Sequence, residues 1–247
     1  MNAPMAAASP GPDRMGEFGR IAGVFWSPQA VFDDLAARPR FWAPLILVSL
    51  LALVVTHTFS QQVGWATYLE EKMAQNRRIQ ELPAETQRQI VEQQTRIVGV
   101  VAYAGAVAGS AAALLVIAGV LQFVFRIAGA SGVSFRQAFG VLCYAWLPFA
   151  LYQILSLLVL LANPRGFNIE NPLPFNIGWF VARGDAPVWL VGMTSSMDVF
   201  SFWVMALIAL GFSAAAKRLR WGKAFGVVFG CWLAMVALKT GWTAMFG

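Results

Sequence analysis

The sequence predicts an all-α membrane protein, a polytopic bundle of about five transmembrane helices, and three observations support this fold class. Of the 247 residues, 58% are hydrophobic and only 12% are charged, whereas a soluble domain has about 45–50% apolar and about 25% charged residues. The charges gather in short stretches that separate long charge-free segments. Several of these segments reach the roughly 20 residues that a helix needs to cross a bilayer. We therefore expect one membrane domain, residues 17–247.

The first residues match neither a span nor a secretory signal. They lack a continuous apolar region and are interrupted by Pro4, Pro10, Gly11 and Pro12. We expect residues 1–16 to form a disordered cytoplasmic tail.

The segment before the first span is amphipathic. Phe18, Ile21 and Phe25 recur at helical spacing, and Ser27 followed by Pro28 is typical of a helix start. In the next ten residues, apolar and charged side chains fall on different faces: Val31, Phe32 and Leu35 on one, Asp33, Asp34 and Arg38 on another. We expect an interfacial amphipathic helix on the inner leaflet, with a plain cytosolic linker as the alternative.

Five segments are predicted to cross the membrane: 41–60, 97–126, 138–162, 198–216 and 222–243. The first contains no acid, lysine or arginine. The second should continue a solvated helix that opens at Pro83. Pro148 is predicted to kink the third, which neighbouring helices make tolerable in lipid. Trp221 and Trp242 frame the fifth, one for each interface.

Basic residues beside these spans set the expected orientation. On the side of the N-terminus they sit directly next to spans, for example at Arg40, Arg126 and Lys223, whereas acids dilute those on the other side. The positive-inside rule then places the N-terminus in the cytoplasm and the C-terminus outside the inner (plasma) membrane. This topology accounts for the net charge of +6, so we expect no nucleic-acid partner.

The sequence offers one catalytic motif. Gly129-Ala130-Ser131-Gly132 has the GxSG form of rhomboid-type intramembrane proteases, and the single histidine is His57. In the expected topology they lie at opposite ends of their spans, about a membrane thickness apart, whereas a Ser–His pair must approach to about 3 Å. We therefore interpret the motif as a flexible turn and His57 as an interfacial polar residue.

Other chemical motifs are absent from the sequence. It contains no HExxH, no Walker-type phosphate loop and no carboxylate pair inside a span. Cys143 and Cys231 lie in apolar segments without CxxC spacing and are expected to be small buried side chains. We therefore predict no catalytic residue, no cofactor and no metal site.

Small residues predict helix-packing faces. GxxxG spacing occurs once in the second span and twice in the fifth, at Gly105, Gly109, Gly222, Gly226 and Gly230. Such faces let two backbones approach closely, so we expect contacts within the chain or between copies.

Polar residues in the spans predict further contacts. Asp198 and Lys239 should lie at similar depth on neighbouring helices and form a candidate ion pair near the outer interface; the alternative is a helix N-cap for Asp198 and a separately snorkelling Lys239. Gln122, Gln153 and Ser156 are expected to hydrogen-bond between helices, with the lining of a pathway as the alternative.

Three stretches together resemble the Yip-domain (Ypt-interacting-protein-like) family. They are SPQAVFDDLAARPRFWAPL, SFRQAFGVLCYAWLPFAL with its aromatic-x-x-x-Pro core at Tyr144 to Pro148, and DVFSFWVMALIALGFS. The resemblance covers the chain from about Phe18 onward and implies a five-span bundle with a cytoplasmic N-terminus. Eukaryotic members are associated with vesicle traffic and Rab-type GTPases. The short tail and the charged stretch 61–96 depart from that pattern, which argues against Rab binding and favours the bacterial branch.

These observations favour a non-catalytic membrane scaffold, adaptor or organiser that acts through helix and lipid contacts. Its expected partners are membrane lipid and a second copy or another membrane protein. The alternative is a transporter or channel subunit for a small solute, which needs polar groups around a midplane cavity. A continuous polar cavity among the second, third and fourth spans would favour the transporter or channel. A dry, closely packed bundle would favour the scaffold, adaptor or organiser.

Overall fold

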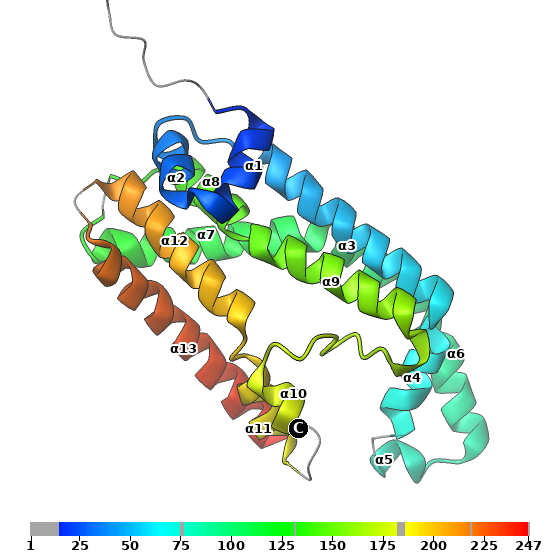
Figure 1. Ribbon diagram of the computed structural model, residues 1–247. Coiled ribbons are helices and arrows are strands. Elements are labelled where there is room, and N and C mark those ends of the chain that lie inside the picture. The colour runs from blue at the N-terminus through cyan, green and yellow to red at the C-terminus, as the bar shows by residue number, and fades with distance from the viewer. Residues whose placement is uncertain (1–14, 75–76, 131, 182–185, 218, 247) are drawn as a thin grey trace, which may run out of the picture.

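The computed structural model describes residues 15–74, 77–130, 132–181, 186–217 and 219–246. In this part of the chain the regular structure is helical, apart from an isolated β-bridge between Asn176 and Asp198 (Figure 1). The predicted all-α fold class is confirmed. Of the predicted cytoplasmic tail, residues 1–14 lie outside the described part.

Five helices in the described chain are long and apolar enough to cross a membrane, in agreement with the five predicted spans. They are α3 (Trp42–Gln62), the continuous helix α6–η1–α7 (Ala84–Ala104, Gly105–Gly109 and Ser110–Ile127), the pair α8–α9 (Phe135–Ala145 and Leu147–Ala162), α12 (Val199–Ala216) and α13 (Trp221–Phe246). As predicted, the second span continues a helix that begins directly after Pro83.

Shorter helices occupy both ends of the bundle (Figure 1). One end, named the α1 end below, holds α1 (Glu17–Trp26) and α2 (Pro28–Ala37). The far end holds α4 (Trp65–Ala74), α5 (Arg77–Gln80), α10 (Ile177–Val181) and α11 (Val188–Ser195). A short 3-10 turn, η2 (Pro164–Gly166), follows α9.

The long helices form two arms that meet at the α1 end and diverge toward the far end (Figure 1). α3 packs along α9 in one arm, and α12 packs along α13 in the other. The second span joins them, because η1 contacts α3 while α7 contacts both α3 and α13. The arms also meet where α9 contacts α12.

Two of the spans contain irregularities. Residues 105–109 of the second span are π-helical, a form that occurs mostly as single turns inside α-helices. The third span is interrupted at Trp146. Pro148 is the second residue of α9; it has no backbone N–H, and its ring disfavours a regular helix through the preceding turn. The interruption therefore lies at the position where the sequence predicts a kink.

The core sits at the α1 end, where both arms meet. Phe32, Phe125, Tyr144 and Phe212 are fully buried there, and the Phe125 and Phe212 rings stack with centroids 4.1 Å apart. Gly211 permits this packing, because a Cβ at this position would lie 2.9 Å from Phe32 Cδ1 of α2 and would overlap the side chain of Val141 of α8. The close approach of α2 and α8 to α12 thus depends on a glycine.

The N-terminal amphipathic segment belongs to this core. It forms two helices that meet at Ser27, and the apolar face of α2 packs against α8 and α12, with Val31, Phe32 and Leu35 at most 1% exposed. Gln137, which completes a capping box at the start of α8, donates to the carbonyl of Ala36 at 2.7 Å. The predicted amphipathic face is therefore covered by protein along α2, while α1 leaves Phe18 and Trp26 strongly exposed.

Candidate functional site

Two apolar crevices lie between the arms, beside the contact of α9 with α12. Crevice A, about 400 Å³, is formed by α7, α9, α12 and α13. Its walls include Val120, Phe149, Met205, Ile208, Val228 and Trp232. The hydroxyl of Ser201, at its rim, donates to the carboxylate of Asp198. Crevice A is thus an almost wholly hydrocarbon surface within the spanning helices.

Crevice B, about 460 Å³, lies on the other side of the α9–α12 contact and is closed on one side by α1. Its walls include Ile21, Phe25, Leu47, Leu51, Ile154 and Trp203. Phe25 and Trp203 meet edge to face, with ring centroids 5.7 Å apart. Because α1 forms part of this wall, the shape of crevice B depends on how α1 is held.

A charged network holds α1 in place. Arg20 is 3% exposed, and its guanidinium contacts the Asp34 carboxylate of α2 at 2.5 Å. Glu17 accepts a hydrogen bond from the Tyr144 hydroxyl of α8 at 2.6 Å and pairs with Arg40, before α3, at 3.1 Å. One helix is thereby tied to three other segments by charge-assisted bonds, the stronger class of hydrogen bond.

These contacts keep both ionisable side chains of α1, Glu17 and Arg20, in their charged form. Burial opposes the charge of Glu17, but the hydrogen bond from Tyr144 and the charges of Arg40 and Arg20 outweigh it, so the pKa of Glu17 lies below its ordinary value. Burial likewise opposes the charge of Arg20, and the hydrogen bond and charge of Asp34 raise its pKa above the ordinary value. The network is therefore ionic at neutral pH.

Comparison with known proteins identifies the family. Residues 22–240 match the family model described as the Yip1 domain. The chain belongs to the Yip1 family. A relative named "Membrane protein YknW", from Bacillus subtilis (strain 168), is 27% identical over 219 residues, which cover 85% of each chain. No solved structure matches. The resemblance predicted from sequence is confirmed, and this Yip1-domain chain is a multi-pass membrane protein.

The glycine faces of this Yip1-domain protein do not pack within the chain. A Cβ added at Gly105, Gly109, Gly222, Gly226 or Gly230 would meet nothing within 4 Å. The predicted intramolecular contacts are therefore wrong, because α13 uses its opposite side, with Ala224 and Val228 buried. Contact between copies through these faces stays a prediction.

Asp198 is a helix N-cap, which was the alternative to an ion pair with Lys239. Its carboxylate accepts a hydrogen bond from the backbone N–H of Ser201 at 2.9 Å and caps the N-terminus of α12. The ion pairs found in the described chain do not join it to Lys239, which is exposed. An N-cap carboxylate already satisfies free amides and gains from the helix dipole, so it does not need Lys239.

The predicted polar residues of the spans line neither crevice. Gln122 donates to the carbonyl of Val133, in the link to α8, and Ser156 donates to Tyr152 within its own helix. Gln153 Oε1 is buried without a hydrogen-bond partner in the described structure. The expected bonds between spanning helices are thus absent for these three residues within the described chain.

Of the two residues that a Ser–His pair would need, the structure describes only His57. His57 Nδ1 lies 3.0 Å from the Tyr103 hydroxyl, which joins α3 to α6, while Ser131 lies outside the described residues. Cys143 is buried and Cys231 lies at crevice A. Among the described residues, no group of three His, Cys, Asp or Glu side chains could hold a metal ion.

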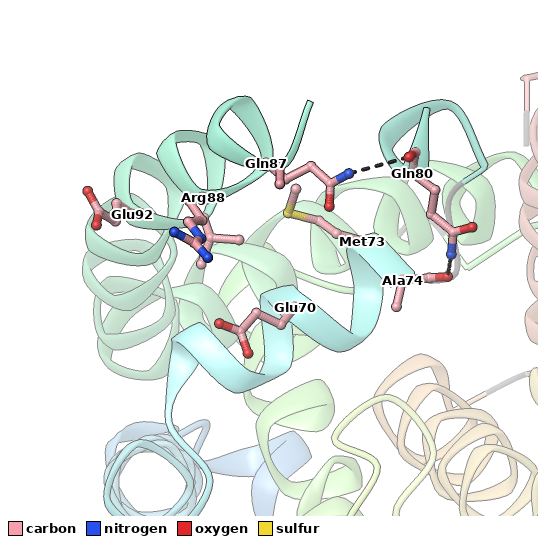
Figure 2. Close-up of a pocket in the computed structure, with 9 residues that line it drawn as sticks. Glu70, Met73, Ala74, Gln80, Gln87, Arg88 and Glu92 are labelled. Atoms are coloured by element: carbon pink, nitrogen blue, oxygen red, sulfur yellow. Dashed lines mark hydrogen bonds between the residues drawn. The ribbon is translucent and has the colours of Figure 1, made fainter. Parts of the chain in front are cut away.

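A separate pocket of about 630 Å³ lies at the far end, between α4, α5 and α6. Figure 2 shows Glu70, Arg88 and Glu92 on one side and Gln80 and Gln87 on the other. The Gln87 amide donates to the Gln80 carbonyl at 3.4 Å. Its polar walls distinguish this pocket from both crevices, with which it shares no lining residue.

Several residues that are important in the structure could not be predicted from the sequence. Arg20 has the sequence context of an ordinary interfacial arginine. Gly140 and Gly211, which lie in close helix contacts, lack GxxxG spacing. A Cβ at Gly140 would lie 3.1 Å from the Arg40 carbonyl. The sequence pointed to this region only through the Tyr144 to Pro148 core of the family resemblance. That core contains Tyr144, which donates to Glu17, and the interruption of the third span at Trp146.

Proposed function

We propose that this Yip1-domain protein is a non-catalytic membrane organiser that holds phospholipid acyl chains in crevices A and B. The single observation that carries the proposal is the pair of hydrocarbon-lined crevices within the spanning helices. We further propose that the α1 end faces the cytoplasm and that the membrane is the inner (plasma) membrane.

The walls of crevice A favour lipid over a transported solute. A transporter site needs polar groups that converge near the bilayer midplane. Crevice A lies among the second, third, fourth and fifth spans, yet the side chains that line it include no charged residue and no amide. This is the dry arrangement expected of a protein that acts through helix and lipid contacts.

The physics of the crevices sets how a chain would be held. An acyl chain in a bilayer is already in hydrocarbon, so entering a crevice gains no hydrophobic free energy. It gains dispersion contacts, about 0.1–0.2 kcal/mol per atom pair, with walls that include the rings of Phe149, Trp203 and Trp232. Ordered retention of a chain therefore requires close packing along the crevice walls.

Lipid photo-crosslinking tests the proposal. The protein would be reconstituted with a phospholipid that carries a diazirine on one acyl chain, and adducts would be mapped by mass spectrometry. We expect adducts concentrated at the crevice walls. Val120→Trp and Leu151→Trp, which fill crevices A and B, should each remove one set, while the exposed Val107→Trp should remove neither. Adducts spread evenly over all exposed apolar positions would refute the proposal.

Cys231 distinguishes the transporter alternative, because it lies at crevice A. Thiol labelling requires thiolate and hence water. A membrane-impermeant cationic methanethiosulfonate should leave Cys231 unmodified in intact proteoliposomes, with the buried Cys143 as the internal reference. Rapid labelling of Cys231 from the aqueous phase would mean a hydrated pathway and would favour a transporter or channel.

A further inference from the structure

The α1 end carries five described cations without a carboxylate partner. They are Arg126, Arg136, Lys217, Arg220 and Lys223, all exposed and none within an ion pair. No Asp or Glu occurs at positions 93–169 or 199–247, so the helices that carry these cations supply no compensating charge. An ion-pair partner for these cations would have to come from another part of the chain or from outside it.

The described acids at this end are already engaged. Glu17 pairs with Arg20 and Arg40. Asp34 pairs with Arg20 and Arg38. The third, Asp33, accepts a hydrogen bond from Gln29 at 3.0 Å. In the described chain, none of these three carboxylates forms an ion pair with any of the five cations, which leaves the cations available to an external anion.

Four of these cations come together at one corner. Lys223 donates to the carbonyl of Ala128 at 3.0 Å, which joins the start of α13 to the end of α7 beside Arg126. Lys217 is the C-cap residue directly after α12, and Arg220 directly precedes α13. We name Arg126, Lys217, Arg220 and Lys223 the cationic corner.

Exposed apolar side chains place this corner at the level of lipid headgroups. Phe123, Ile127 and Trp221 are 65%, 73% and 46% exposed. Tryptophan is enriched where the membrane meets water, and basic groups between spanning helices on the cytoplasmic side form lipid-headgroup sites. A phosphate at this depth would meet several cations at once.

A row of aromatic rings connects the corner with crevice A. Along α13, Trp221 stacks with Phe225 at 5.3 Å, Phe225 with Phe229 at 6.0 Å, and Phe229 with Trp232 at 5.6 Å. Trp232 lines crevice A. A chain that starts at the corner can therefore lie along these rings and enter the crevice.

We propose that the cationic corner binds the headgroup of an anionic phospholipid, such as phosphatidylglycerol, one of whose chains lies in crevice A. The chain placement rests on the proposed function of the crevices, whereas the headgroup preference rests on the unpaired cations. Each Lys or Arg near an anionic membrane surface favours binding by about fivefold. The corner should therefore select anionic over zwitterionic lipid, more weakly as salt rises.

Competition between lipids tests this preference. The full chain would be placed in nanodiscs with equal phosphatidylglycerol and phosphatidylcholine, and the lipids retained after release would be counted by native mass spectrometry. We expect retained phosphatidylglycerol to exceed phosphatidylcholine at least tenfold. The preference should disappear in the variant R126Q/K217Q/R220Q/K223Q. A matched control, R88Q/R96Q/R165Q/K239Q, removes the same amount of charge from exposed residues outside the corner. This control should keep the preference for phosphatidylglycerol.

A smaller variant protects the test against misfolding, because Lys223 supports the end of α7. The side chains of Lys217 and Arg220 make no hydrogen bond or ion pair with the described chain. K217Q/R220Q should therefore fold normally and lose at least about fivefold in preference. Equal retention of both lipids by the natural chain would overturn the proposal, as would equal losses in the corner and control variants.

Two further readouts separate the parts of the proposal. If crevice A photo-adducts persist with phosphatidylcholine while no anionic preference exists, the corner proposal fails and the proposed function stands. If the preference exists but crevice adducts are absent, the proposed function fails and the chain placement with it. Free glycerol phosphate should not displace the lipid. Displacement at millimolar concentration would show that the headgroup alone is bound and would overturn the placement of its chain in crevice A.

Discussion

Arg20 of α1 and Asp34 of α2 form an ion pair of 2.5 Å whose side chains are 3% and 10% exposed. This pair joins two short helices that make different contacts: α2 packs in the core, and α1 closes crevice B. A charge pair removed from water depends on both partners. Loss of Arg20 would leave the buried Asp34 carboxylate with the exposed Arg38 alone, and loss of Asp34 would leave Arg20 with Glu17 at 3.4 Å.

Arg20→Ala should destabilise the protein by up to about 3–5 kcal/mol, the typical cost of breaking a buried ion pair, because Asp34 keeps only the exposed Arg38 as a partner. The control is Arg38→Ala, which removes an exposed partner of the same Asp34 and should cost about 1 kcal/mol or less. Thermal unfolding followed by tryptophan fluorescence in detergent would compare the two. Similar losses would mean that burial of Arg20 adds nothing.

The Glu17 carboxylate should make stability depend on pH. Its folded-state pKa lies below the ordinary value, so its contribution is complete above the ordinary pKa of about 4.3. It is lost as the pH falls through the folded-state value. Melting temperatures measured from neutral to acidic pH should therefore converge for the natural protein and Glu17→Gln at low pH. The control is Asp33→Asn, at an exposed site bonded only to Gln29, which should change the melting temperature at neutral pH less than Glu17→Gln does.

Gly211→Ala should destabilise the protein by about 1–3 kcal/mol, the typical cost of overpacking a core, because the added Cβ would lie 2.9 Å from Phe32 Cδ1. Gly226→Ala is the matched change on α13, where nothing lies within 4 Å. There, stability should stay level or rise by up to about 1 kcal/mol from helix propensity. Apparent melting temperatures of both variants provide the measurement, and a harmless Gly211→Ala would contradict the packing described.

Lys217→Gly should stabilise the protein by about 1 kcal/mol. Lys217 caps α12 with φ 54°, a left-handed value that costs a residue with a Cβ about 1–2 kcal/mol. Ala215→Gly, inside the same helix, should instead lose about 1 kcal/mol. Chemical or thermal unfolding in one detergent would show opposite signs for the two glycines. A loss in both would mean that the Lys217 side chain contributes more than its backbone strain costs.

Much of the fold was predictable because it follows from local chemistry. Charge-free segments long enough to span a bilayer predicted the five spanning helices, and Pro148 predicted the position of the interrupted span. The capping alternative for Asp198 was also readable, since an acid followed by an apolar run is a typical helix start. The candidate site could not be predicted in this way, because no sequence pattern indicated the two crevices or the burial of Arg20.

The order of residues was enough to predict that this chain crosses a membrane through helices and that it belongs with the Yip1 family. The folded molecule was needed to see that the glycines of α13 face outward while Gly211 makes the close contact, and that two arms leave hydrocarbon-lined crevices between them. The physical reason is that lipid chains and protein interiors are equally apolar. The identity of a hydrophobic residue in a span therefore does not predict whether its side chain will contact a lipid, line a crevice or pack against another helix.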